Sequence, residues 1–223
     1  MHRLLAHVDS WIFDLDNTLY PASSDLFGLI DRRMTAYVAR LTGFAPAEAY
    51  ALQKRYFHEH GTTLCGLMAE HGTDPHDFLE DVHAIEMDVL VEDRLLVEAI
   101  GALPGRKFVF TNGDAAYARR VLERLGLGGS FEAIHDIHAC AYTPKPAAAS
   151  YASMLAAFDI EPERALFAED MARNLKPAKA LGMTTLWVDN GSEQAGIEAG
   201  PDDDFIDYRT AALAPWLAHI LEN

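Results

Sequence analysis

The segment Trp11 to Phe13 is a short apolar run that stops at two acidic residues, Asp14 and Asp16. A run of this length that ends in polar residues is typical of a buried β-strand. Carboxylates at the end of a buried strand indicate a site, because buried charges need partners. The segment WIFDLDNTLY, residues 11 to 20, therefore predicts a central strand that opens onto acidic side chains.

The region from Ser23 to Leu90 has helical periodicity and no convincing strand. Apolar residues recur at intervals of three or four before Gly43, which suits a helix end: Leu26, Ile30, Met34, Val38 and Leu41. Pro46 suits the start of a helix that runs through Tyr56, and Asp74 followed by Pro75 predicts the start of another. This region is predicted to be a small helical bundle.

Strands and helices alternate in the rest of the chain. Strands are predicted at 107–110, around Ile134, at 165–168 and at 184–188, with a further short one at 205–206. Helices are predicted at 92–103, 114–126, 146–158, 171–181 and 216–221, the last begun by Pro215. The predicted fold class is α/β: a Rossmann-like parallel sheet core, residues 1–19 and 91–223, with an inserted helical bundle, residues 20–90.

Charge and cysteine content narrow the range of partners. With 18 basic and 34 acidic residues the formal net charge is −16, so a nucleic-acid polymer is not expected as a partner. The two cysteines, Cys65 and Cys140, are too few for a disulfide framework and indicate a reduced, cytoplasmic location. No leader-like segment and no uninterrupted apolar run of about 18 residues is present, so neither export nor membrane association is expected.

Polar residues gather at the predicted carboxyl ends of the strands, where open parallel sheets bind ligands. They are Asp14, Asp16, Thr111, Asn112, Glu169 and Asp170, and Lys145 joins them from a position before a predicted helix. Oxygen ligands of this kind suit Mg²⁺, which can bridge a carboxylate nucleophile and a phosphate oxygen. Two unit charges about 4 Å apart interact by about 4 kcal/mol at an effective dielectric near 20, so a metal ion and Lys145 would decide whether an anion can approach.

Four segments resemble, in order, the four motifs of the haloacid dehalogenase superfamily of phosphatases. They are DLDNT from Asp14, FTNGD around Thr111, PKP around Lys145 and AEDMARN around Asp170. The resemblance implies that Asp14 attacks phosphorus to form an aspartyl-phosphate, which water then hydrolyses. It also implies that Asp16 donates a proton to the leaving oxygen and then removes one from the attacking water.

The same resemblance implies the remaining roles in the site. Thr111 and the Asn112 backbone N–H would hold phosphate oxygens, together with Lys145, which would neutralise developing charge. Mg²⁺ would be bound by Asp14, the Asp16 backbone carbonyl and Asp170, with Glu169 acting through a metal-bound water. Thr18 and Asn174 would contact these groups without touching the metal or the substrate, and Asn174 would orient Lys145 or Asp170.

The position of the helical insert resembles a type 1 cap, which closes over the site and selects the leaving group. Within it, YFHEHGTTLCGL, from Tyr56 to Leu67, resembles the pyrimidine 5′-nucleotidase branch. That likeness implies a small phosphomonoester substrate, a nucleoside monophosphate such as UMP or CMP. Tyr56, His60 and Thr62 would then lie near the base or ribose.

Other functions remain open at this point. A mutase or a phosphatase for sugar phosphates or phosphoglycolate would use the same four motifs, since these describe phosphoryl transfer and not the leaving group. A dehalogenase is disfavoured because that branch usually lacks the second aspartate, here Asp16. A receiver-like phosphoacceptor and an inactive scaffold are the non-enzymatic alternatives. Oligomeric state does not follow from the sequence.

Overall fold

In the computed structural model, residues 5–192 and 204–222 are described, so the predicted core segments 1–19 and 91–223 fall partly outside these ranges. The sheet contains the strands β1 (Ser10–Phe13), β2 (Arg106–Phe110), β3 (Ala133–His135), β4 (Ala165–Glu169), β5 (Thr184–Val188) and β6 (Tyr208–Thr210). All pairings are parallel, and the strand order is β3-β2-β1-β4-β5-β6. The predicted α/β fold with a parallel sheet is confirmed.

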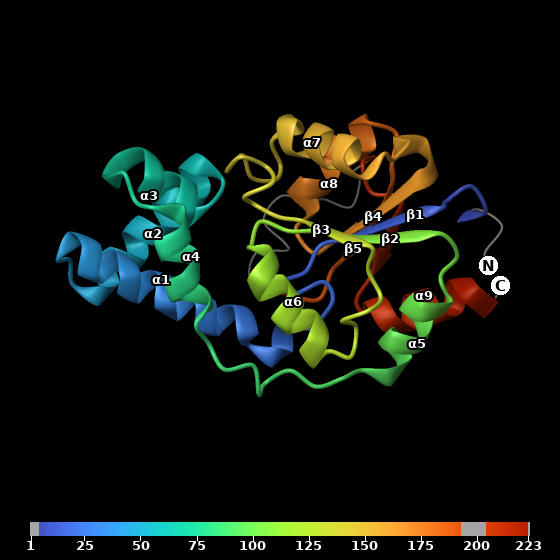
Figure 1. The fold of residues 1–223 in the computed structure, drawn as a ribbon, viewed down its shortest axis with the longest axis horizontal. Coiled ribbons are helices and arrows are strands. Elements are labelled where there is room, and N and C mark those ends of the chain that lie inside the picture. Colours follow the sequence, from blue (N-terminus) through green and yellow to red (C-terminus); the bar gives the residue numbers. More distant parts are fainter. Residues whose placement is uncertain (1–4, 193–203, 223) are drawn as a thin grey trace.

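Helices cover both faces of the sheet, as Figure 1 shows. One face carries α5 (Arg94–Ala102), α6 (Ala115–Arg124) and α9 (Leu213–Glu222), and the other carries α7 (Ala148–Phe158) and α8 (Ala172–Ala180). Side chains alternate between the faces along each strand: Trp11 and Phe13 belong to one core cluster and Ile12 to the other. The central strands β1 and β4 are buried along their whole length and are mostly apolar, as expected where both faces of a sheet are covered.

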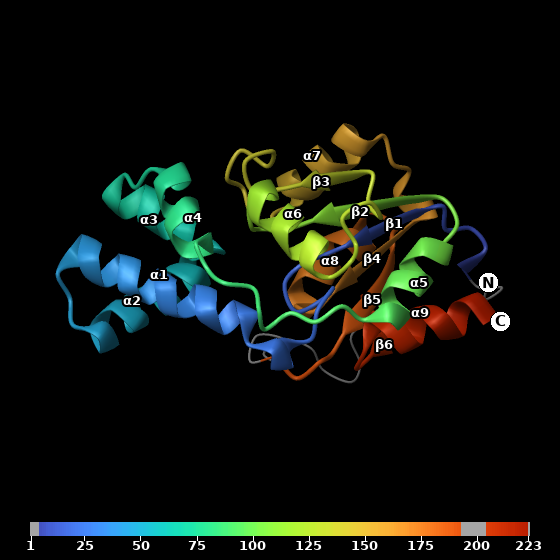
Figure 2. The same cartoon turned by 60° about the horizontal axis from the view of Figure 1, so that its bottom comes forward.

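A helical layer, defined here as α1 to α4, lies beside the carboxyl ends of the strands (Figures 1 and 2). Its helices are α1 (Leu26–Thr42), α2 (Pro46–His60), α3 (Thr63–His71) and α4 (Pro75–His83), preceded by a 3₁₀ turn at Ala22–Ser24. Gly43 ends α1 with a φ of 73°, a left-handed conformation that favours glycine. The Asp74 side chain caps α4 by accepting from His76 N at 2.8 Å, as its sequence predicts.

Two predictions near the carboxyl terminus are wrong in detail. Phe205 and Ile206 do not form a strand; β6 begins at Tyr208. The Asp207 carboxylate accepts from Thr185 N at 3.0 Å, and this contact holds the chain in a turn before the strand begins. Helix α9 begins at Leu213, so Pro215 lies inside its first turn, where a missing N–H costs no helical hydrogen bond.

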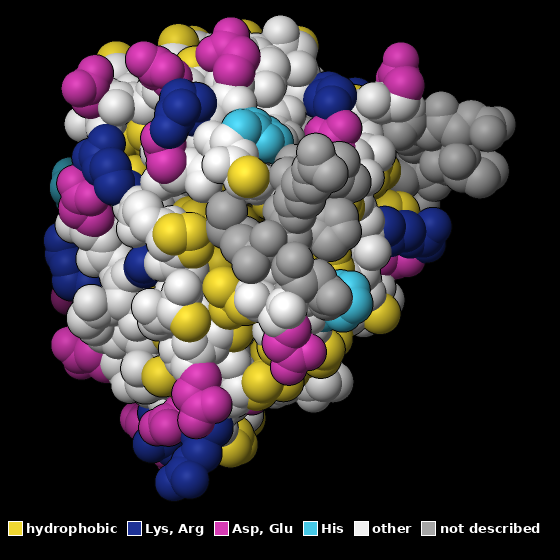
Figure 3. Space-filling view, turned by 90° about the vertical axis from the view of Figure 1, so that its right-hand side faces the viewer, with side chains coloured by type: hydrophobic (Ala, Val, Ile, Leu, Met, Phe, Trp, Pro, Cys, Tyr) yellow, Lys and Arg dark blue, Asp and Glu magenta, His cyan; other side chains and the backbone are white. Residues whose placement is uncertain are grey.

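The end of the molecule farthest from the helical layer carries both signs of charge. Figure 3 shows lysine and arginine side chains interspersed with acidic ones among the described residues of this face. Within the described ranges, every helix is too short or too polar to span a lipid bilayer.

Candidate active site

Lys145 lies at the centre of the site, and its ammonium group makes three contacts. Nζ donates to Asp14 Oδ1 at 2.7 Å, to Glu169 Oε2 at 2.7 Å and to the Phe110 carbonyl at 2.9 Å. The Lys145 side chain is 1% exposed. Asp14 follows β1, Phe110 ends β2 and Glu169 ends β4, so one ammonium group joins three adjacent strands. The geometry follows from parallel strands that end at the same edge of a sheet.

The Lys145 main chain is fixed by Asn112. The Asn112 carboxamide oxygen accepts from Lys145 N at 2.9 Å, and its amino group donates to Lys145 O at 3.3 Å. The sequence motif pointed only to the backbone N–H of Asn112, so this use of its side chain was missed. Thr111 is buried beside it, and its hydroxyl accepts from Gly113 N at 2.9 Å.

Three carboxylates converge at the ends of β1 and β4. One oxygen from each of Asp14, Glu169 and Asp170 lies within 4.8 Å of the other two, and all three residues are buried. Asp170 Oδ2 accepts from the Ser192 hydroxyl at 3.1 Å. The Asp16 carboxylate does not belong to this group, and the metal contact predicted for its backbone carbonyl stays a prediction.

The three carboxylates repel one another because they carry like charges, and the Lys145 ammonium group forms ion pairs with two of them, Asp14 and Glu169. Burial, followed by the charge of Glu169, raises the pKa of Asp14 to about 8 despite the contact with Lys145. Burial and the charges of Glu169 and Asp14 raise the pKa of Asp170 well above its ordinary value. Burial alone would lower the pKa of Lys145, but Asp14 and Glu169 outweigh it and raise this pKa.

Asp16 is held by two buried tyrosines. Its Oδ1 accepts from Tyr20 Oη at 2.5 Å and from Tyr117 Oη at 2.7 Å. Burial raises the pKa of Asp16, while the two phenolic hydrogen bonds oppose this rise. Tyr20 follows Asp16 by four residues, which was a usable sequence signal, whereas Tyr117 on α6 is distant in the sequence and could not be found from it.

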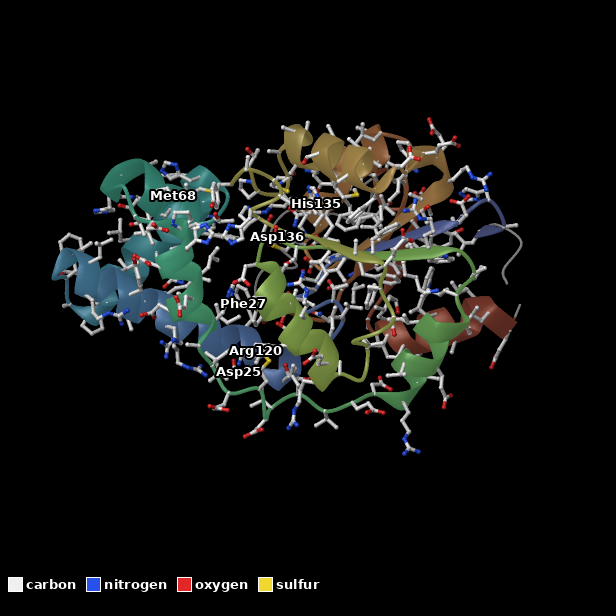
Figure 4. The ribbon with its side chains drawn as sticks, viewed as in Figure 1. Asp25, Phe27, Met68, Arg120, His135 and Asp136 are labelled. Atoms are coloured by element: carbon white, nitrogen blue, oxygen red, sulfur yellow. The ribbon has the colours of Figure 1, made fainter. Side chains whose placement is uncertain are left out.

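The cavity above these residues has walls from the core and from the helical layer, and its volume is about 120 Å³. The layer contributes mostly apolar side chains, together with a polar set from α1 and α2. The apolar ones are Phe27, Ile30, Met34, Phe57, Leu64, Phe78, Leu79 and Val82. Figure 4 shows Phe27 on α1, with His135 at the end of β3 and Asp136 directly after it, at the edge of the sheet that faces the layer.

The polar set consists of Asp31, Gln53 and Lys54, and it was not predicted. Asp31 Oδ1 accepts from Lys54 Nζ at 2.8 Å and from Gln53 Nε2 at 2.6 Å, and the Gln53 carboxamide oxygen accepts from Thr35 at 2.5 Å. All three residues line the cavity. Each occurs within a helix and carries no motif, so only the packing of α1 against α2 brings them together.

Of the three residues predicted to contact substrate, only Thr62 lines the cavity. Its hydroxyl caps α3 by accepting from Cys65 N at 3.2 Å. The prediction for Tyr56 is not supported, because this side chain is 1% exposed within the helical layer and its hydroxyl contacts Glu70 and His71. His60 also lies outside the cavity lining, and its ring nitrogen is 3.7 Å from Glu70.

Thr18 and Asn174 are buried close to the site, but within the described part of the chain neither side chain forms a recorded hydrogen bond with the catalytic residues. The Thr18 hydroxyl and the Asn174 carboxamide oxygen have no hydrogen-bond partner among the described residues. The three donors of the Lys145 ammonium go to Asp14, Glu169 and Phe110, so the predicted orientation of Lys145 by Asn174 is not seen. Instead, the Asn174 carbonyl accepts from Tyr151 Oη at 2.5 Å.

Comparison with protein families and curated proteins gives two findings. The family described as "haloacid dehalogenase-like hydrolase" matches residues 8–182. The Saccharomyces cerevisiae protein named "Phosphate metabolism protein 8" is 27% identical over 194 residues, which is 78% of this chain. The matched region covers only 59% of the yeast protein's length.

Three solved structures share the fold at low sequence identity. A HAD phosphatase from Thermococcus onnurineus has a TM-score of 0.63 and 17% identity, with 96% of this chain and 98% of that chain covered. The magnesium-bound putative HAD-hydrolase YfnB from Bacillus subtilis has a TM-score of 0.61 and 16% identity, with 97% and 99% covered. L-2-haloacid dehalogenase from Xanthobacter autotrophicus has a TM-score of 0.59 and 17% identity, with 96% and 98% covered.

Proposed function

The chain belongs to the haloacid dehalogenase-like hydrolases, and from this premise we propose that it is a magnesium-dependent phosphomonoesterase. The observation that carries the proposal is the buried contact of Lys145 with both Asp14 and Glu169. To the neighbouring Asp16, whose Oδ1 accepts from Tyr117 Oη, we assign the proton transfer. A positive charge at the nucleophile favours the approach of a phosphate dianion. The name of the yeast relative, which refers to phosphate metabolism, supports the same chemistry.

In the proposed reaction, an Asp14 carboxylate oxygen forms a bond to phosphorus while the bond from phosphorus to the leaving oxygen breaks. Asp16 transfers its proton to that oxygen, so the product leaves as a neutral alcohol. Water then attacks the aspartyl-phosphate and gives a proton back to Asp16, and phosphate leaves with regeneration of the Asp14 carboxylate. We assign the neutralisation of negative charge in both steps to Lys145, and the binding of phosphate oxygens to the Thr111 hydroxyl and the Asn112 N–H, which follow β2.

The donor set of the site fits a hard divalent cation. One oxygen from each of three buried carboxylates lies within 4.8 Å of the other two, and Lys145 forms ion pairs with two of these residues, Asp14 and Glu169, which leaves negative charge for a cation to neutralise. Asp14 and Asp170 would hold the ion, with the Asp16 backbone carbonyl, and Glu169 would act behind them. When bound, Mg²⁺ would neutralise this charge and polarise a phosphate oxygen.

The substrate that we propose is a nucleoside 5′-monophosphate, with a preference for pyrimidines such as UMP and CMP. Aromatic and aliphatic side chains of the helical layer offer a surface on which a flat base can pack, and Lys54 offers a hydrogen-bond donor for a base carbonyl. On this proposal the helical layer acts as a type 1 cap over residues 20–90.

Sugar phosphates are the second candidate, because Asp31 and Lys54 could also bind the hydroxyl groups of a sugar. A dehalogenase is disfavoured, since a halide leaves without needing the proton that Asp16 is placed to supply. Long nucleic acids are not proposed as substrates because the net charge is −16.

The test is phosphate release from UMP, CMP, AMP, sugar phosphates and phosphoglycolate, each measured with magnesium and with a chelator. We expect chelator-sensitive hydrolysis with UMP and CMP as the best substrates, and no turnover by Asp14→Asn. A preference for sugar phosphates would retain the mechanism and change the substrate. Halide release from 2-haloacids without phosphate release would refute the proposed function.

A further inference from the structure

We propose that Tyr20 and Tyr117 are positioning residues that leave one defined oxygen of Asp16, Oδ2, to carry the transferred proton, and that His83 of the helical layer fixes Tyr117 for this task. The inference deepens the proposed function and rests on it. It assigns a role in proton transfer to residues outside the four sequence motifs, one of which comes from a separate part of the fold.

Both tyrosine hydroxyls converge on the same oxygen of Asp16. Tyr20 Oη lies 2.5 Å and Tyr117 Oη 2.7 Å from Oδ1, and the two hydroxyls are 3.4 Å apart. Both tyrosines are almost fully buried. Oδ2 forms no hydrogen bond within the described residues, although Asp16 lines the cavity.

This asymmetry decides where a proton on Asp16 can reside. An oxygen that already accepts two phenolic hydrogens has no free position for a third, so a protonated Asp16 carries its proton on Oδ2. Two donors on one oxygen also prevent the carboxyl group from rotating and exchanging its oxygens. The proton is therefore presented on Oδ2, the Asp16 oxygen to which no described residue forms a hydrogen bond, where the leaving oxygen of a substrate can accept it.

Tyr117 is itself held by the end of α4. Its ring stacks on the His83 ring with centroids 4.2 Å apart and an interplanar angle of 10°. His83 Nδ1 lies 2.5 Å from Asp114 Oδ2, and the other Asp114 oxygen accepts from Tyr117 N at 2.8 Å. Asp114 thus contacts both members of the stacked pair.

Arg120 completes the contact between α6 and the end of α4. It donates to the His83 carbonyl at 2.9 Å and to the Ile85 carbonyl at 2.8 Å. Arg120 lies on α6 where the core faces the helical layer (Figure 4). The position of the Tyr117 hydroxyl therefore depends on how the end of α4 docks on α6, and this links the helical layer to proton transfer by Asp16.

The test compares two esters of similar size, p-nitrophenyl phosphate and p-methylphenyl phosphate. The first has a leaving group that departs without a proton, whereas the second depends more on general acid catalysis. For Tyr117→Phe we expect the ratio of kcat/KM between the first and the second ester to rise about tenfold. For Tyr20→Phe combined with Tyr117→Phe we expect a rise of about a hundredfold, approaching the ratio of Asp16→Asn.

The matched control is Tyr56→Phe. Tyr56 is also a buried tyrosine whose hydroxyl makes two contacts, with Glu70 and His71, but it lies outside the cavity. Its loss should lower stability without changing the ratio. If Tyr117→Phe slowed both esters by the same factor, its role would be purely structural and the inference would be wrong.

The His83 part is tested by His83→Ala and by His83→Phe, which retains a ring for stacking. We expect His83→Ala to raise the ratio of kcat/KM between the two esters, and His83→Phe to give a ratio close to that of the original protein. His83→Ala should add little in the Tyr117→Phe background, because both act through one contact. Independent, multiplying effects would refute the link. Failure of the unaltered protein to hydrolyse either ester would instead refute the proposed phosphatase function.

Discussion

The Asn112 carboxamide hydrogen-bonds to both the N–H and the carbonyl of Lys145, at 2.9 and 3.3 Å. Asn112 is the second residue after the end of β2, and Lys145 lies in the loop before α7. One side chain therefore connects two loops of the core. The ammonium group at the other end of Lys145 lies between Asp14 and Glu169. Asn112 therefore holds the backbone of Lys145, whose ammonium group balances the negative charge of the site.

Replacing Asn112 with alanine should lower kcat about tenfold and raise KM by a smaller factor, because the displaced Lys145 loses its alignment. The free energy of unfolding should fall by about 1–3 kcal/mol, since the Lys145 main-chain groups lose their partner. Steady-state kinetics and chemical denaturation measure the two effects. Thr185→Ala is the control: it removes a buried hydroxyl that contacts Phe205 and Asp207 and should destabilise the protein without lowering kcat.

Asp14→Asn should abolish turnover and yet stabilise the metal-free protein. In the folded state burial and Glu169 raise the pKa of Asp14 from 3.8 to about 8, so the folded state binds this proton more tightly than the unfolded state. Stability contributed by this proton is present below pH 3.8 and is lost as the pH rises to about 8. Asparagine does not titrate, so the variant does not lose this stability as the pH rises. Its free energy of unfolding should therefore exceed that of the original protein by an amount that grows to the order of 1–3 kcal/mol over that pH range.

Thermal unfolding in chelator at pH 5 and pH 8.5 would measure the effect of Asp14→Asn. Added magnesium should reduce the difference in stability between the two proteins, because it neutralises the same carboxylate repulsion that the asparagine removes. A variant less stable than the original protein at both pH values would show that the Lys145 contact outweighs the repulsion.

Asp114→Asn isolates the contact with His83, because asparagine caps a helix about as well as aspartate. Burial alone would raise the pKa of Asp114, but the hydrogen bond and charge of His83 outweigh burial and lower it from 3.8. The resulting stability is complete above pH 3.8 and is lost as the pH falls through the lowered pKa. We expect a loss of about 1 kcal/mol at pH 7 that fades in acid, measured by urea denaturation. A pH-independent loss would contradict this.

Lys54→Met should change substrate preference and leave the chemistry intact. The methionine keeps the apolar stem but removes the ammonium group that Asp31 holds at the cavity wall. We expect kcat/KM for UMP to fall about tenfold and that for p-nitrophenyl phosphate to change less than about twofold, since only the nucleotide has a base to bind. Lys179→Met, which removes an ion pair with Asp207 outside the cavity, is the matched control. Equal losses on both substrates would assign Lys54 to packing.

The residues at strand ends were predictable because a strand has a simple sequence signal and a fixed direction. Asp14, Thr111 and Glu169 each follow an apolar run, and parallel strands must end at one edge of the sheet. Lys145 was found through its motif. The strand at Tyr208–Thr210 was misplaced because its position is set by the Asp207 contact with Thr185, a tertiary interaction that leaves no local pattern.

The sequence by itself determined the parallel sheet, the helical insertion and the identity of the charged groups at the strand ends, since periodicity and motifs are local properties of the chain. Only the tertiary structure decided which side chains from distant parts of the chain contact the charged groups at the strand ends. It brought Tyr117 to Asp16 and Lys54 to the cavity, and it placed Tyr56 in the packing of the helical layer. A hydrogen bond between residues 101 positions apart depends on how whole helices pack, and single helices do not encode that packing.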